Sequence, residues 1–169
     1  MVNGLTNRRA VIAAIASLPL GARAALAAEY IDLEWRDLLP RGQTAIPPVV
    51  QNLIDHDEMA TSAMQPKSSG VRTDWNGQIV RIPGFIVPIE YSGSGVSAFI
   101  LVPFVGACIH VPPPPANQLV FVTTPEPYES SGLYEAVNVI GMFGTASMST
   151  QLADIAYALS AEKIVPFTV

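Results

Sequence analysis

The stretch that decides the fold is QIVRIPGFIVPIEY (residues 78–91), a long run of β-branched residues with Gly84 at its centre. β-Branched residues favour strands, and a glycine inside a strand is typical of a bulge or a sharp bend. We therefore expect one long strand that bends at Gly84 and serves two faces of a sheet.

Further strands are expected on the C-terminal side of this stretch. SGSG (92–95) is typical of a hairpin turn, and VSAFILVPF (96–104), NQLVFVTT (117–124) and YEAVNVIGMFGTASM (134–148) are the next strands. The C-terminal DIAYALSAEKIVPFTV (154–169) fits either a helix or a strand. We favour a strand that ends at Pro166, because a barrel needs a closing edge.

These elements predict a mainly β protein, a small OB-like, roughly five-stranded antiparallel barrel with one short N-terminal helix. An open antiparallel sandwich is the alternative. The helix is expected at residues 47–58, where Val49, Val50 and Leu53 have helical spacing after two prolines. The predicted organisation is an export signal at 1–28, an N-terminal segment with the helix and a polar connector at 29–77, and the barrel at 78–169. Within the N-terminal segment, YIDLEWRDLLP (30–40) is expected to dock onto the barrel.

The first 28 residues have the features of an export signal. Arg8 and Arg9 precede an apolar run from residue 10 to 20, and Ala25-Leu26-Ala27 is a small-x-small cleavage site. The apolar run is too short to span a bilayer, and the mature chain is not expected to insert into a membrane. We expect a periplasmic protein, with the general secretory and twin-arginine routes both left open.

Charge excludes one class of partner. From Glu29 onward there are six lysines and arginines against 14 acidic residues, which gives a net charge of −8. An acidic domain lacks the electrostatic footprint of a nucleic-acid binder, so cations or a basic protein surface are the expected partners.

The chain has one cysteine, Cys108, and His110 follows it by two residues, before a run of four prolines. One cysteine cannot form an internal disulfide, so it is buried and inert, pairs with another chain or binds a metal. In an extended chain the side chains at i and i+2 share a face, and thiolate and imidazole bind zinc or copper. Cys108 and His110 are therefore candidate metal ligands, and His56 is the candidate from elsewhere in the chain.

Two other groups have a plainer interpretation. The segment DHDEM (55–59) could complete a metal site, but a charged run is typical of a solvated helix end. Met142 and Met148 could bind Cu(I), but methionine in an apolar strand usually fills a core. No hydrolase motif is present, and a cysteine and histidine two residues apart on a strand rarely form a nucleophile–base pair, so no enzyme activity is expected.

The run GACIHVPPPPANQ (106–118), together with IPGFIVPIE and WRDLLP, resembles a family of small exported bacterial proteins known only as a domain of unknown function. The resemblance covers roughly residues 34–167. It implies a metal-linked accessory role near ABC-type exporters, although this chain lacks the lipid-accepting cysteine of anchored members.

The leading hypothesis is a periplasmic metal-linked binding or accessory protein with Cys108 and His110 as ligands, associated with an ABC-type exporter or another envelope protein. The alternative is a non-catalytic interaction module that presents the proline loop to an envelope partner. The expected partner-binding residues are Pro112, Pro113, Pro114, Pro115, Asn117 and Gln118.

Overall fold

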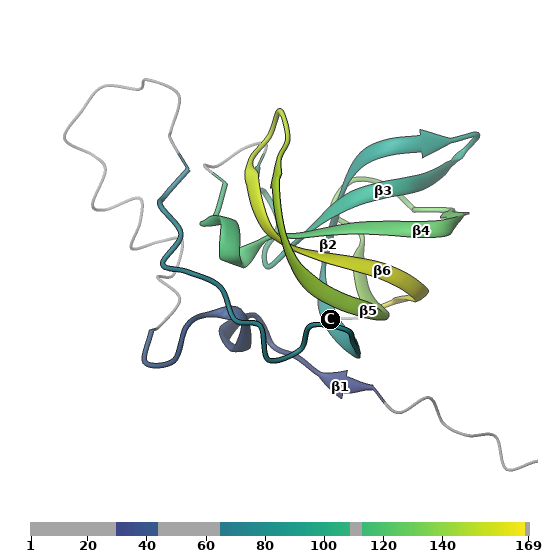
Figure 1. Ribbon diagram of the computed structural model, residues 1–169. Coiled ribbons are helices and arrows are strands. Elements are labelled where there is room, and N and C mark those ends of the chain that lie inside the picture. The colour runs from purple at the N-terminus through teal and green to yellow at the C-terminus, as the bar shows by residue number, and fades with distance from the viewer. Residues whose placement is uncertain (1–29, 44–64, 109–112, 168–169) are drawn as a thin grey trace, which may run out of the picture.

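The computed structural model describes residues 30–43, 65–108 and 113–167, and this part of the chain forms one sheet that closes into a barrel. The neighbours around the barrel wall run β2-β3-β4-β6-β5, and β5 pairs back onto β2. Figure 1 shows these strands wrapped around one another, with the short β1 and the N-terminal segment to one side. The strands are β1 (Ile31–Asp32), β2 (Gln78–Ser92), β3 (Gly95–Val102), β4 (Val120–Tyr128), β5 (Ala136–Ser149) and β6 (Asp154–Pro166).

This arrangement confirms the predicted OB-like, five-stranded barrel, with β1 as one extra strand beside β2. The β2–β5 pairing closes the wall and excludes the open sandwich. One joint differs from the antiparallel expectation, because β4 and β6 run parallel from Val120↔Tyr157 to Thr123↔Ser160. The reason is geometric: five strands in a closed ring cannot alternate direction at every joint, so one pair must be parallel.

The bend in β2 is at the predicted glycine. Residues from Gln78 to Phe85 pair with β5, and residues from Phe85 to Ser92 pair with β3. A Cβ atom on Gly84 would lie 2.7 Å from Cγ of Leu101 and 2.9 Å from the carbonyl oxygen of Val102. Only glycine lets the strand pass this close to β3, so this residue lets one strand serve two parts of the wall.

The C-terminal segment is a strand, as favoured, and β6 ends at Pro166. The helix expected at residues 47–58 lies outside the described residues. Within the described ranges the only helical turns are 3-10 turns, η1 (Trp35–Leu38) and η2 (Ala116–Gln118). None of these described helical segments has the length and apolar character needed to cross a membrane.

The barrel interior is filled by the inward-facing residues of all five wall strands, with Phe99, Phe143 and Tyr157 as its largest members. The N-terminal segment docks onto this core, as expected for residues 30–40. Leu33 and Leu38 are buried in it, and Tyr157 donates its hydroxyl to the Leu38 carbonyl at 2.7 Å. The described part of the N-terminal segment therefore shares one core with the barrel.

Candidate functional site

A second apolar cluster lies outside the barrel interior. We call it the outer-wall cluster. A strand with one solvent-exposed face usually alternates between apolar and polar residues. By contrast, β3 is buried on both faces, and its outward-facing residues Ile100 and Val102 are fully buried. The loop after β3 and the turn between β5 and β6 cover them. The buried members of the cluster are Val87, Ile100, Val102, Ala107, Cys108, Leu119, Ala153 and Ile155.

Cys108 belongs to this outer-wall cluster and is 9% exposed. Burial among apolar side chains raises the pKa of its thiol to about 11. The thiolate is the form that attacks substrates and binds metals, so the described surroundings keep Cys108 in its unreactive form near neutral pH. The residue also has a φ of 69°, a left-handed conformation that costs a non-glycine residue about 1–2 kcal/mol, and cluster packing offsets this cost.

The structure describes Cys108 but not its predicted partners in a metal site. His110 and His56 both lie outside the described residues, as does the segment DHDEM at 55–59. Among the residues that the structure describes, no group of three histidines, cysteines or acids could hold a metal ion. Met142 and Met148 are exposed on β5, at 52% and 36%. Zinc or copper binding therefore stays a prediction.

The structure describes three of the four prolines in the proline loop. Pro112 lies outside the described residues, whereas Pro113 and Pro115 are half-buried and Pro114 is buried. Gln65 donates its side-chain N–H to the Pro114 carbonyl at 2.7 Å. The described prolines therefore lie against other parts of the chain, and a contact between this loop and a partner stays a prediction.

Asn117 and Gln118, expected as partner-binding residues, are buried. Asn117 Nδ2 donates to the Gly70 carbonyl at 2.7 Å and to Ser69 Oγ at 3.1 Å. Gln118 Nε2 donates to the Trp35 carbonyl at 3.0 Å. Both side chains hold segments from before the barrel onto its surface, a role that the sequence pattern does not reveal because those segments are about 50 to 80 residues away in the chain.

A groove on the outer wall is the first candidate binding site, and we call it the outer groove. It lies between the second half of β2 and the turn that joins β5 to β6, with Phe121 of β4 among its lining residues, and its volume is about 750 Å³. OB-type barrels bind ligands on the strand face that such loops flank. Its lining residues are Pro88, Ile89, Glu90, Phe121, Met148, Ser149, Thr150, Gln151 and Leu152.

The rim of the outer groove is held in place by hydrogen bonds within the turn and by hydrogen bonds to Gln65. Thr150 Oγ1 accepts the backbone N–H groups of Leu152 at 3.2 Å and Ala153 at 3.1 Å. The Gln65 side chain donates to the Asp154 carbonyl and accepts the Asp154 N–H, each at 2.8 Å. A rim that is already ordered loses little conformational entropy on binding, so the outer groove is suited to binding a ligand.

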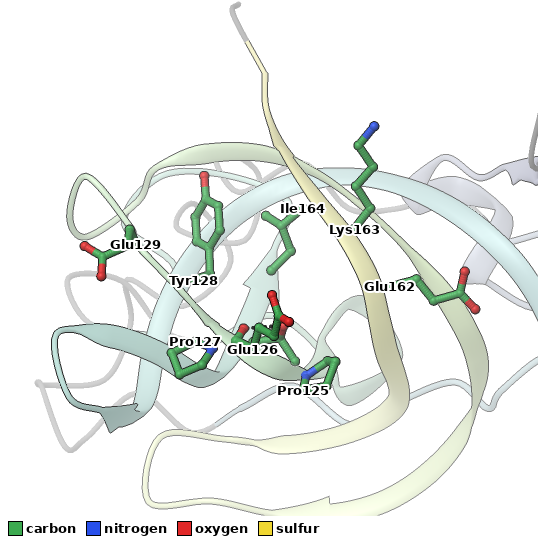
Figure 2. Close-up of a pocket in the computed structure, with 9 residues that line it drawn as sticks. Pro125, Glu126, Pro127, Tyr128, Glu129, Glu162, Lys163 and Ile164 are labelled. Atoms are coloured by element: carbon green, nitrogen blue, oxygen red, sulfur yellow. Dashed lines mark hydrogen bonds between the residues drawn. The ribbon is translucent and has the colours of Figure 1, made fainter.

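A second groove, which we call the edge groove, lies where β4 and β6 separate, and its volume is about 590 Å³. Figure 2 shows Tyr128 of β4 and Ile164 of β6 at this gap, with Glu162 and Lys163 pointing away from it. Tyr128 and Ile164 are half-buried and pack against the barrel core. The groove is lined by Thr124, Pro125, Glu126, Pro127, Tyr128, Glu129, Glu162, Lys163 and Ile164.

Hydrogen bonds fix the tyrosine of the edge groove. The Tyr128 hydroxyl donates to Glu135 Oε1 at 2.8 Å. Burial, followed by this bond to Glu135, raises the pKa of Tyr128 to about 12. Burial acts to raise the pKa of Glu135, but hydrogen bonds from Tyr128, Ser130 and Ser131 outweigh it and lower that pKa. The Tyr128 hydroxyl is therefore held against the Glu135 carboxylate at this groove.

Comparison with known proteins identifies the family. A DUF3299 family protein (PA4066) from Pseudomonas aeruginosa PAO1, solved as a crystal structure, shares 35% sequence identity with this chain. The two structures superpose with a TM-score of 0.70. The similarity covers 83% of this chain and 98% of that one. None of the curated proteins compared with the chain matches it. The pattern described as "Protein of unknown function (DUF3299)" matches residues 35–166, which confirms the family resemblance seen in the sequence. The chain therefore belongs to the DUF3299 family, a domain of unknown function.

Proposed function

We propose that this chain is a non-catalytic accessory protein of the cell envelope that holds a partner protein in its outer groove. The observation that carries the proposal is the groove itself, a cavity of about 750 Å³ with a fixed rim on the ligand-binding side of an OB-type barrel. The aromatic Phe121 and the aliphatic Ile89 and Leu152 supply apolar contact surface, and Glu90 and Gln151 supply polar groups.

The chemistry of the site supports binding over catalysis. Cys108 is the chain's one thiol, and its pKa of about 11 leaves it protonated at the pH of the envelope. The expected export signal at residues 1–28 favours a partner in the envelope. An ABC-type exporter or another envelope protein is the partner that the family resemblance implies.

A metal-linked form of this function is the second candidate, and it rests on the Cys108–His110 spacing with His56 as a further ligand. A metal would have to displace the thiol proton against a raised pKa, which weakens binding near neutral pH. Calorimetric titration of the reduced protein with Zn²⁺ and with Cu(I) tests it. Stoichiometric uptake that is lost in Cys108→Ala supports the metal-linked form, and no uptake of either metal rules it out.

The partner-binding proposal is tested with a photo-crosslinker at the outer groove. In a Cys108→Ala background, Gln151→Cys provides one labelling site in the groove, and Ser131→Cys provides a matched site on an exposed turn elsewhere. We expect an envelope protein to be captured from residue 151 and not from residue 131. Adding Met148→Asp should reduce that capture, because it removes an apolar, exposed side chain from the groove. Equal capture at both sites would contradict the proposal.

A further inference from the structure

We propose that the edge groove binds a basic, extended segment of a partner protein as an additional strand along β6. This inference goes beyond the proposed function because it concerns a different surface, between β4 and β6, and a different mode of recognition. Strand addition uses unpaired backbone N–H and C=O groups of a sheet edge for affinity and alternate side chains for specificity.

The unpaired edge follows from the sheet register. The β4–β6 pairing ends at Thr123↔Ser160, although β4 continues to Tyr128 and β6 to Pro166. Beyond Ser160, β6 is paired with β5 alone among the described strands. The barrel wall is therefore open along the second half of β6.

The groups that face this gap can be assigned by alternation. Phe167 donates its N–H to the Ala136 carbonyl at 2.8 Å, so Phe167 points its backbone groups toward β5. Residues of the same parity, Val165 and Lys163, do the same, because backbone groups alternate between the two edges of a strand. Ile164 lies between them and directs its N–H and C=O into the gap. This residue supplies the donor and acceptor for an added strand.

The opposite side of the gap is a poor partner for a strand. Pro125 and Pro127 of β4 have no N–H groups, and prolines of this kind are a known protection of sheet edges. Thr124 donates its hydroxyl to the Glu126 carbonyl at 2.7 Å, which occupies one acceptor of β4. From Ala161 to Val165, β6 contains no proline. An incoming strand therefore pairs with β6, and the β4 side limits the width of the groove.

Charge selects the occupant. Glu126 and Glu129 line the edge groove, whereas the side chains of Glu162 and Lys163 point away from it. A second copy of this chain would bring a second set of these acids into the same gap, so charge disfavours self-association through this edge. A segment with lysine or arginine on alternate residues would place its cations near the acids and its small apolar residues over Tyr128 and Ile164. The structure therefore favours a basic, alternating segment.

The experiment uses a peptide in which lysine and valine alternate over six residues, its glutamate–valine counterpart, and two N-methylated forms of the lysine peptide. One form carries methyl groups on the backbone nitrogens of its lysine residues, and the other carries them on the backbone nitrogens of its valine residues. Each added methyl group removes a backbone donor without changing charge. Binding to the full chain is measured by fluorescence anisotropy.

We expect the lysine peptide to bind and the glutamate peptide not to bind. One methylated form should lose about tenfold in affinity, because its backbone donors face β6, and the other should change by less than about twofold. Glu126→Gln should weaken binding about twofold to fivefold, whereas Glu34→Gln, an exposed acid that lines neither groove, should leave it unchanged.

Three outcomes overturn this inference: no binding of the lysine peptide at 1 mM, equal binding of both methylated forms, or an equal effect of the Glu126 and Glu34 variants. The second outcome means that charge attraction alone holds the peptide. Failure here leaves the crosslinking from residue 151 unaffected, because that experiment probes the outer groove. Failure of the crosslinking likewise leaves the peptide results unaffected, so the two proposals can fail separately.

Discussion

Removing the hydroxyl of Tyr157 tests whether the N-terminal segment is an integral part of the fold. This hydroxyl donates to the Leu38 carbonyl and accepts the Arg72 backbone N–H, both at 2.7 Å. It therefore joins two segments from before the barrel to β6. Tyr157→Phe keeps the ring, including its contact with Phe143 at 5.2 Å between centroids, and deletes these two bonds alone.

The magnitude follows from the burial of the groups left behind. The bond to the Leu38 carbonyl is buried, and a buried acceptor without a donor costs about 1–3 kcal/mol. The Arg72 N–H is part-buried and can regain water, which makes its loss smaller, about 0.5–1 kcal/mol. We expect Tyr157→Phe to lower the free energy of unfolding by about 2–3 kcal/mol. With a denaturant slope of about 1.5–2 kcal/mol per molar, the urea midpoint falls by about 1–2 M.

The assay is urea unfolding followed by circular dichroism and tryptophan fluorescence, with Tyr91→Phe as the matched control. Tyr91 is 64% exposed, so losing its hydroxyl should change the free energy of unfolding by less than about 0.5 kcal/mol. If the two variants behave alike, the N-terminal segment is not held by Tyr157 and the account of the shared core is wrong. A changed slope would instead show that Tyr157→Phe releases the segment before the barrel unfolds.

Three further predictions concern other parts of the barrel. Native Cys108 should react with a neutral-pH thiol reagent about a hundredfold more slowly than in urea, because its pKa rises from 9.0 to about 11; equal rates would show that the thiol is accessible. Gly84→Val should destabilise the fold by at least about 1–3 kcal/mol, since the added atoms collide with Leu101 and the Val102 carbonyl; a change below 0.5 kcal/mol in thermal unfolding would contradict the close approach of β2 and β3. The folded-state pKa of Glu135 is lowered, so its contribution to stability is complete above its unfolded pKa of about 4.5 and is lost as pH falls through the lower folded value. Glu135→Gln should therefore show a smaller loss of stability than the natural chain between pH 5 and pH 3, and identical curves would refute this.

The strands were predictable because their signals are local. β-Branched runs bounded by turn residues predicted the first four wall strands, and Gly84 marked the bend in β2. The C-terminal segment fitted either a helix or a strand, and the strand was favoured because a barrel needs a closing edge. The parallel joint between β4 and β6 was not predicted, because the sequence contains no local signal for which pair of strands runs parallel. The register of β4 and β6 depends on the order of the whole sheet, and five alternating strands must meet once in the same direction.

The candidate site was harder to predict, because it depends on contacts between distant segments. The sequence marks Cys108 as unusual, but it does not reveal that the loop carrying Cys108 folds back over Ile100 and Val102. The same holds for Asn117 and Gln118, whose partners lie before the barrel. A polar residue next to four prolines is typical of an exposed loop. Asn117 and Gln118 are buried here because segments from before the barrel pack against them.

The run GACIHVPPPPANQ (106–118) therefore has a structural role in the part that the structure describes. Ala107 and Cys108 cover the outward face of β3, Pro114 accepts a hydrogen bond from Gln65, and the following amides hold the N-terminal segment and the connector. Gln65 also holds Asp154 beside the rim of the outer groove. One side chain, Gln65, therefore links the proline loop to that rim, and the run at residues 106–118 and the outer groove are joined through it.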